Sequence, residues 1–291
     1  MGRRGYYHLF SDGFRTDVLF EDVKAFVAGM NIVALCYLKC EARILAFVLM
    51  DNHVHFILYG EEQECILFRD KFIHRYGIWF SNAYPGRRCE MLDFDIKLID
   101  GERYLLNSIT YVLRNGIAAG YAYSADDYLW SSGGIYFRLP QRMETLVSSW
   151  KTISEIPSTE CRRMFNTRDK FPADWRVTPE GFIWPGNYLD FRLVESLFKS
   201  SNAFTFFMGQ LKEREINESL GINDRVSLPD LELREKAVNK SYKLYSETNL
   251  RNLDVRQRIA IGKELRREYR CSVKQIARII HLDPKYLKEL L

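Results

Sequence analysis

Residues 43–59, RILAFVLMDNHVHFILY, decide the predicted fold of the amino-terminal part of this chain. Two runs rich in aliphatic and aromatic residues flank the polar pair Asp51-Asn52, a pattern that predicts two β-strands joined by a tight turn. Side chains alternate along a strand, so His53 and His55 are expected to point to the same face of the sheet. The apolar residues between and after them would then point to the opposite face.

The segments around this hairpin complete a recognisable order of elements. Apolar spacing predicts a strand over 6–10, helices over 20–38 and 62–83, a strand over 95–99 and a helix over 102–119. The order β-α-β-β-α-β-α predicts an α+β fold, with two helices against one face of a four-stranded antiparallel sheet in a ferredoxin-like or RRM-like layer. The helix over 102–119 is then expected to lie across the other face.

That helix carries polar groups on the side expected to meet the sheet. Tyr111 and Asn115 are four residues apart and therefore share a face. Two imidazoles about 6–7 Å apart along a strand can share one metal ion or one phosphate. If the helix lies over His53 and His55, Asn115 supplies a carbonyl oxygen as third ligand and Tyr111 a nucleophile. The alternatives are two histidines on a wet sheet face and a core tyrosine with its hydroxyl satisfied locally.

Four segments of the chain resemble known proteins. Residues 50–56, MDNHVHF, resemble the HUH motif (His, bulky apolar residue, His) of single-strand DNA transposases. Residues 111–115, YVLRN, resemble their catalytic helix, in which Asn or Gln follows the tyrosine by four positions. Residues 128–132, YLWSS, and the pair Tyr7-His8 are similar to segments of the REP-associated tyrosine transposases.

The resemblance covers about residues 6–137, with its motifs in the expected order. There are two departures. The family usually has Asn-Pro-Val after the tyrosine turn, whereas this chain has Asn115-Gly116-Ile117, and Asp51 stands where the family usually has Pro. Neither departure removes an expected ligand or the expected nucleophile.

The resemblance implies metal-dependent cleavage and strand transfer on single-stranded DNA that carries hairpins or palindromic repeats. Tyr111 would attack a phosphate, giving a 5′-phosphotyrosine link and a free 3′-hydroxyl. A divalent ion, Mg or Mn, would be held by His53, His55 and Asn115, with Mn bound more tightly because imidazole favours it. A phenol with a pKa near 10 is a fair leaving group for the return step. No side chain stands out as a general base.

The carboxyl-terminal end is basic and predicts a second DNA contact. Residues 231–291 hold 15 Lys and Arg against 8 Asp and Glu, whereas the other 230 residues hold 27 against 30. Helices are predicted over 255–269, 273–280 and 285–291, a pattern typical of a helix-turn-helix. It would present Lys285, Tyr286 and Lys288 to the major groove of duplex DNA, with Lys274 as a further contact. The alternative is a trihelical module with only a packing role.

These observations divide the chain into three parts: a nuclease domain over 1–138, a middle segment of unknown role over 139–240, and a helix-turn-helix domain over 241–291. The main alternative function is a domesticated transposase that has lost the reaction and acts as a sequence-specific DNA-binding protein. An RRM-like RNA binder is disfavoured because an RNP-like aromatic strand is lacking. A replication initiator or relaxase commonly has a third histidine or paired tyrosines, and the sequence places neither beside His53.

A zinc module is a further alternative, because Cys36 and Cys40 precede His53 and His55 at spacings that resemble a zinc finger. It fails on the histidine pair, since a finger needs three to five residues between histidines on a helix and this strand has one.

The composition indicates an ordinary globular protein of the cytoplasm. Of the 291 residues 47% are hydrophobic, and the six Cys are scattered, as suits a reducing compartment. The purest apolar run, residues 44–50, is too short to span a bilayer, and the first residues lack the apolar segment of a signal peptide. We therefore expect a soluble cytoplasmic protein without a membrane partner. Whether a homodimer builds the site from two chains is left open.

Overall fold

The computed structural model describes residues 4–11, 19–86, 89, 94–210, 216, 228, 230–269, 271, 273–283 and 287, without the side chains of residues 230, 231 and 274. The chain forms two compact units, Met1–Ile216 and Asn217–Leu291. No helix among the described residues is long and apolar enough to cross a membrane.

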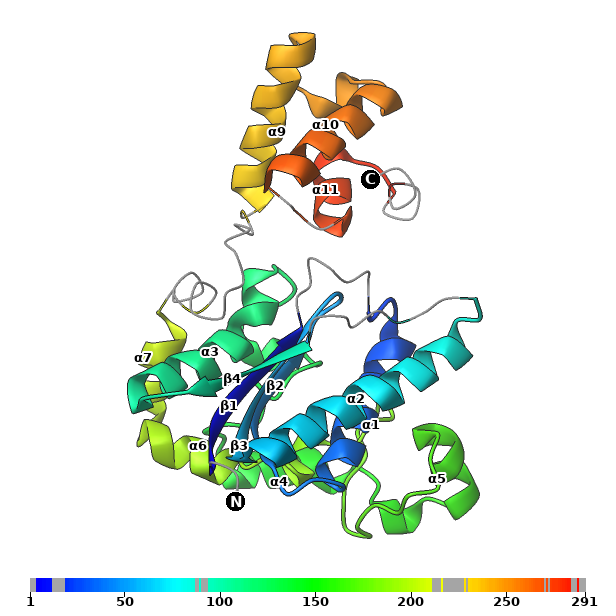
Figure 1. The fold of residues 1–291 in the computed structure, drawn as a ribbon, viewed down its shortest axis with the longest axis vertical. Helices are drawn as coiled ribbons and strands as arrows, with labels where there is room; N and C mark the ends of the chain where they lie inside the picture. Colours follow the sequence, from blue (N-terminus) through cyan, green and yellow to red (C-terminus); the bar gives the residue numbers. More distant parts are fainter. Residues whose placement is uncertain are drawn as a thin grey trace. The chain divides into compact units, whose positions relative to one another are not determined.

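The first unit is built on a four-stranded antiparallel sheet, as the sequence predicts (Figure 1). Its strands are β1 (Arg4–Ser11), β2 (Arg43–Leu49), β3 (Val54–Glu61) and β4 (Phe94–Ile99). They lie in the order β2-β3-β1-β4, so β1 and β3 are the central pair although more than forty residues separate them. The register places Phe10 opposite His55 and Tyr6 opposite Tyr59.

Helices α1 (Val23–Tyr37) and α2 (Glu62–Ala83) cover one face of this sheet (Figure 1). The Asp22 side chain caps α1 by accepting a hydrogen bond from the Ala25 N–H at 2.8 Å, which satisfies one of the free amides at the helix start. Phe56 of β3 packs against Phe68 and Phe72 of α2, with ring centroids 5.2 Å apart in both pairs. The apolar set of β3 therefore faces α1 and α2.

Helix α3 (Glu102–Ala118) packs on the opposite face, where it contacts β2 and β3 (Figure 1). Its polar side chains are partly satisfied within the helix, since Ser108 Oγ donates to the Tyr104 carbonyl at 2.8 Å and Thr110 Oγ1 to the Leu106 carbonyl at 3.1 Å. The helix begins after Gly101, whose φ of 91° is a conformation that favours glycine.

The YLWSS segment runs along the outer edge of β2. Leu49 N–H donates to the Trp130 carbonyl at 2.9 Å, and Ser132 N–H donates to the Phe47 carbonyl at 3.0 Å. Tyr128 adds a hydroxyl bond to the Leu49 carbonyl at 2.8 Å. These bonds satisfy the edge strand, which would otherwise expose unpaired backbone groups.

The rest of the first unit consists of short helices and loops. The helices are α4 (Pro140–Ser148), α5 (Ser158–Phe165), α6 (Phe191–Phe198) and α7 (Ser201–Met208). Asn31 of α1 is buried and joins this region to the sheet layer, accepting from Ile183 N–H at 2.8 Å and donating to the Gly181 carbonyl at 3.3 Å. The boundary expected at 138/139 is therefore not a division in the structure, because residues 139–208 pack with the first unit.

The second unit is helical, with α9 (Asp230–Tyr245), α10 (Val255–Tyr269) and α11 (Val273–Ile280). Its core includes Leu233 of α9, Leu265 of α10 and Ile276 of α11. The boundary expected at 240/241 falls inside α9, because that helix shares its core with α10 and α11. Of the expected DNA contacts, Lys285, Tyr286 and Lys288 lie outside the described residues, and Lys274 is described only as part of the α11 backbone.

Candidate functional site

The structure brings together the four residues that the sequence singled out for chemistry. His55 lies on β3 and His53 just before it, with ring centroids 5.1 Å apart. Tyr111 and Asn115 lie on α3, which crosses the same face. The Tyr111 and His55 ring centroids are 5.2 Å apart, and His53 Nε2 lies 3.2 Å from Asn115 Oδ1.

The orientation of the His53 ring is fixed by its neighbour. His53 Nδ1 lies 2.8 Å from Asn52 Oδ1, an amide oxygen that can only accept. In the neutral tautomer protonated at Nδ1, His53 donates this hydrogen bond to Asn52. The other nitrogen, Nε2, then offers a lone pair, which is the form of histidine that binds metal ions.

The amide of Asn115 is oriented just as firmly. Its Nδ2 donates to the Tyr111 carbonyl at 2.9 Å, one helical turn earlier. This bond turns the amide oxygen toward His53 Nε2, which lies 3.2 Å away. With the ring proton on Nε2 the contact is an ordinary hydrogen bond, whereas with the proton on Nδ1 both atoms are acceptors and a cation beside them makes the arrangement favourable. The donor chemistry therefore fits a bound divalent ion.

A third histidine completes this part of the site. His8 of β1 places its Nε2 atom 3.1 Å from His55 Nδ1. Both residues are buried. Burial, and then the charge of Lys97, lowers the pKa of His8 to about 3, and burial followed by the charges of His53 and His8 lowers the pKa of His55. Both rings are therefore neutral near pH 7. His8 Nδ1 has no hydrogen-bond partner among the described residues.

His8 is the site residue whose place the sequence reasoning missed, although the Tyr7-His8 pair was noted as part of the resemblance. Two signals could have placed it: period-two alternation puts it on one face of the first strand, and a β-α-β-β-α-β order makes that strand a neighbour of the third. The sequence places no third histidine beside His53, and the histidine found in the structure lies beside His55. His8 contacts His55 rather than His53, so it does not form a three-histidine cluster around one point.

Tyr111 lies deep in this site. Its ring is edge-on to both histidines, with centroids 5.2 Å from His55 and 6.0 Å from His8, and the residue is only 7% exposed. The α3 helix thus places a phenol and an amide, four residues apart, above the imidazoles of His53 and His55.

The two departures from the expected motifs have structural partners. Asp51, in place of Pro, accepts a hydrogen bond from the Tyr121 hydroxyl at 3.1 Å, while its carbonyl accepts from Leu19 N–H at 2.6 Å. Gly116, in place of Pro, lies against Tyr128, where an added Cβ would come 2.6 Å from the ring. The turn before His53 and the end of α3 are therefore each held by a tyrosine.

No group of three or more His, Cys, Asp or Glu side chains suited to a metal ion occurs in the described part of the chain. A zinc module would require Cys36 and Cys40 to join His53 and His55 in such a group, and they do not. A metal site here would have to use the amide oxygen of Asn115 as its third protein ligand.

Comparisons of the sequence with protein-family models and with curated proteins found no match. Among solved structures, the chain is similar to a REP-associated tyrosine transposase bound to a REP hairpin, at a TM-score of 0.33 and 12% sequence identity. The superposition covers 61% of this chain and 96% of that chain.

Proposed function

We propose that this protein cleaves and rejoins single-stranded DNA, with Tyr111 as the nucleophile and a divalent metal ion held by His53, His55 and Asn115. The observation that carries the proposal is the contact between His53 Nε2 and Asn115 Oδ1 at 3.2 Å. His53 Nδ1 is bonded to Asn52, and Asn115 Nδ2 is bonded to the Tyr111 carbonyl, so the remaining polar atom of each side chain faces the other.

The reaction is a transesterification at phosphorus. The Tyr111 oxygen forms a bond to the phosphorus atom, and the bond from phosphorus to the 3′-oxygen of the preceding nucleotide breaks. The phenol proton leaves to solvent and the departing 3′-oxygen takes up a proton, giving a 3′-hydroxyl. In the return step a 3′-hydroxyl attacks the 5′-phosphotyrosine and the phenol leaves.

The chain's own residues prepare this step in three ways. Burial keeps His55 neutral, as a metal ligand must be. The hydrogen bond between His8 Nε2 and His55 Nδ1 holds the His55 ring in place. Helix α3 holds Tyr111 at a fixed position above the strand. When bound, Mg or Mn would polarise a non-bridging phosphate oxygen and offset the developing negative charge.

Hairpin or palindromic DNA is proposed as the substrate because of the sequence motifs at 50–56, 111–115 and 128–132. The second candidate function is a DNA-binding protein that has kept this arrangement and lost the reaction. The low exposure of Tyr111, 7%, favours this second function, because a nucleophile must be accessible to a phosphate of the substrate and Tyr111 is buried.

The deciding experiment is a covalent-adduct assay. Single-stranded oligonucleotides from the flanks of the gene, including any hairpins, carry a label at the 3′ end, because the fragment joined to Tyr111 is the one downstream of the cut. They are incubated with Mn or Mg and run on a denaturing protein gel. We expect a labelled protein band with the wild type and none with Tyr111→Phe.

Tyr104→Phe is the matched control, since it removes another hydroxyl from the same helix and should leave the band intact. A band that survives in Tyr111→Phe would refute the assignment of the nucleophile. No band with either protein, despite tight binding of the oligonucleotide, would establish the DNA-binding alternative.

A further inference from the structure

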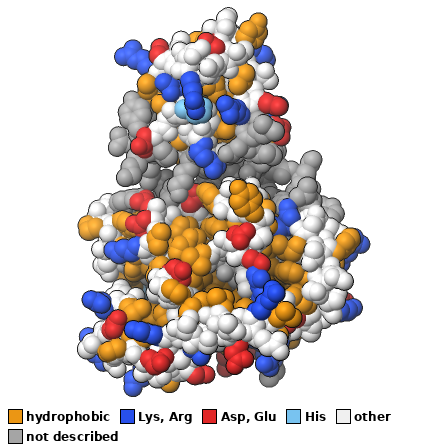
Figure 2. Space-filling view, turned by 180° about the vertical axis from the view of Figure 1, so that it is seen from behind, with side chains coloured by type: hydrophobic (Ala, Val, Ile, Leu, Met, Phe, Trp, Pro, Cys, Tyr) orange, Lys and Arg blue, Asp and Glu red, His pale blue; other side chains and the backbone are white. Residues whose placement is uncertain are grey.

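Three arginines of the carboxyl-terminal unit, from three different elements, bring positive charge to bear on His281. Arg234 lies on α9, Arg251 in the 3-10 turn Leu250–Asn252, and Arg258 on α10. Arg258 Nη1 donates to the His281 carbonyl at 3.2 Å, and its Nε donates to the Leu253 carbonyl at 3.1 Å. Figure 2 shows Lys and Arg side chains around the histidine of this unit, on one face.

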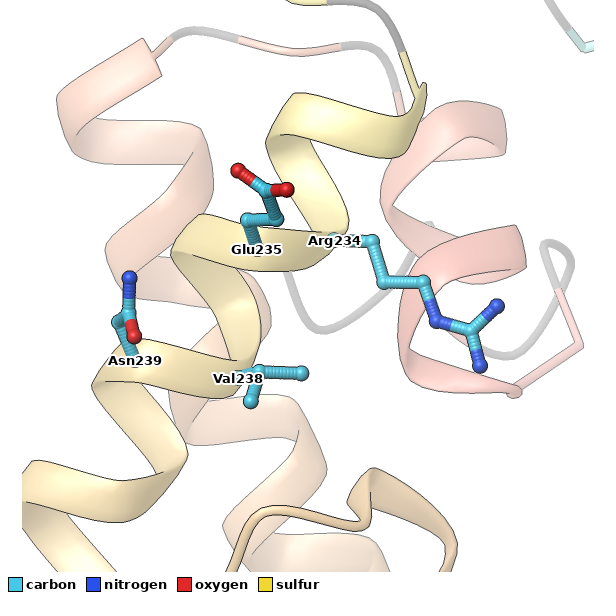
Figure 3. Close-up of a pocket in the computed structure, with 4 residues that line it drawn as sticks. All are labelled: Arg234, Glu235, Val238 and Asn239. Carbon is cyan, nitrogen blue, oxygen red and sulfur yellow. The ribbon is translucent and has the colours of Figure 1, made fainter.

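The positive charge of this cluster is not offset by acidic partners. Arg234, Arg251 and Arg258 take part in none of the ion pairs between described residues, and Arg234 and Arg251 are exposed. Burial, followed by the charges of Arg251, Arg234 and Arg258, lowers the pKa of His281, so the three cations act on one point. Figure 3 shows Arg234 extending from α9 away from Glu235, within the depression that these two residues line with Val238 and Asn239.

Clustered guanidinium groups without carboxylate partners repel each other, and an anion would remove that cost. The guanidinium fork matches a phosphate in two parallel hydrogen bonds, which makes arginine the usual residue for this ligand. Three guanidinium groups suit a ligand with several phosphates, such as a nucleic acid backbone, better than they suit one isolated phosphate ion.

The position of the cluster indicates which polyanion it meets. Helix α11 ends at Ile280, His281 has a left-handed φ of 55°, and the Leu287 N–H then donates to the Asp283 carbonyl at 3.0 Å, as in a new helical turn. Arg258 contacts this turn through the His281 carbonyl, and the charges of Arg234 and Arg251 also act on His281. In helix-turn-helix proteins the helix after such a turn enters the major groove of duplex DNA, and flanking residues contact the backbone.

We propose that Arg234, Arg251 and Arg258 form a phosphate-binding surface for the backbone of duplex DNA. This surface and the proposed function have only one thing in common, DNA as the partner. Binding by the surface requires neither Tyr111 nor a metal ion. Binding by this surface is independent of base sequence and serves to position the unit on the duplex.

The test uses the full-length chain and a fluorescein-labelled duplex of mixed sequence, with affinity measured by anisotropy across a series of salt concentrations. EDTA and the Tyr111→Phe background remove any contribution from the reaction. Each phosphate contact contributes about 0.9 to the slope of log K against log salt. We expect Arg234→Gln/Arg251→Gln to reduce that slope by about two and to weaken binding by about fivefold to tenfold per arginine at 0.1 M salt.

The matched control is Lys263→Gln/Arg266→Gln, which removes the same charge from exposed positions of α10 in the same unit. It should change the slope by less than one, and both variants should keep the wild-type melting temperature because the altered side chains are exposed. Equal losses in the two variants would show that only net charge matters and would overturn the proposal. So would unchanged DNA binding together with lost binding to anionic phospholipid vesicles, which would identify a membrane as the partner.

Discussion

The Nε2 atom of His53 lies 3.2 Å from the Oδ1 atom of Asn115, and in the tautomer that donates from Nδ1 to Asn52 neither of these two atoms carries a hydrogen. The arrangement is not a chance rotamer, because Asn52 orients the imidazole and the Tyr111 carbonyl orients the amide. The two residues come from a strand and a helix that are distant in sequence. Their convergence is what distinguishes this site from two histidines on a wet sheet face.

The first prediction concerns this pair and a metal ion. With Mn at about a hundred times its dissociation constant, ligand linkage stabilises the folded protein by about 2.7 kcal/mol. The wild-type melting temperature should then rise by about 5–10 °C for the first unit. Asn115→Ala removes a ligand and should abolish most of this rise, as seen by differential scanning fluorimetry.

His74→Ala is the control for that measurement, because His74 is an exposed histidine of α2 outside the site. It should respond to Mn as the wild type does. An equal rise in Asn115→Ala and the wild type would mean that Mn binds without the amide, and the proposed ligand set would be wrong.

The second prediction concerns pH and His8. Its pKa is lowered to about 3 in the folded protein, against about 6.5 when unfolded. Between these values the unfolded chain binds a proton that the folded chain does not, so stability falls as the pH is lowered. His8 should account for about 2 kcal/mol of the loss between pH 7 and pH 5. Urea unfolding of His8→Gln in EDTA should show a correspondingly smaller loss.

The same measurement on His74→Gln provides the comparison, because this substitution removes an exposed histidine of α2 that lies outside the site. If His8→Gln and the wild type lose the same free energy of unfolding between pH 7 and pH 5, His8 is not held neutral by burial.

The third prediction concerns the glycine that follows Asn115. Gly116→Ala places a Cβ 2.6 Å from the Tyr128 ring, at a point where the ring itself is held by its bond to the Leu49 carbonyl. Overpacking of this kind should cost about 1–3 kcal/mol, measured by urea unfolding. Gly77→Ala, in α2 with nothing within 4 Å, should instead stabilise the protein by about 0.5–1 kcal/mol. A stabilising Gly116→Ala would contradict the close packing.

The fourth prediction concerns the attachment of the region after residue 138 to the sheet layer. Asn31→Ala leaves the Ile183 N–H and the Gly181 carbonyl without their side-chain partner in a buried place. Unsatisfied buried groups cost about 1–3 kcal/mol each, so the free energy of unfolding should fall by that order. Asn202→Ala, at an exposed position of α7, should change it by less than about 0.5 kcal/mol. Equal changes in the free energy of unfolding of Asn31→Ala and Asn202→Ala would contradict the proposed role of the Asn31 hydrogen bonds in this attachment.

The strands and helices of the first unit up to α3 were predictable because each one has a local periodicity. The hairpin at 43–59 and the helix over 62–83 have apolar residues at the spacing of their secondary structure, and both occur as predicted. The domain boundaries were not predictable in this way. Residues 139–208 have weak periodicity, and their place in the first unit depends on contacts such as Asn31 with Ile183, which are 152 residues apart.

The sequence by itself determined that His53 and His55 share one face of a strand, and that Tyr111 and Asn115 share one face of a helix. Both follow from backbone geometry over a few residues. Only the tertiary structure decided that these two faces meet, that His8 lies against His55, and that Arg258 contacts the His281 carbonyl. Periodicity says which way a side chain points along its own element, whereas pairing between distant segments depends on the packing of the whole chain.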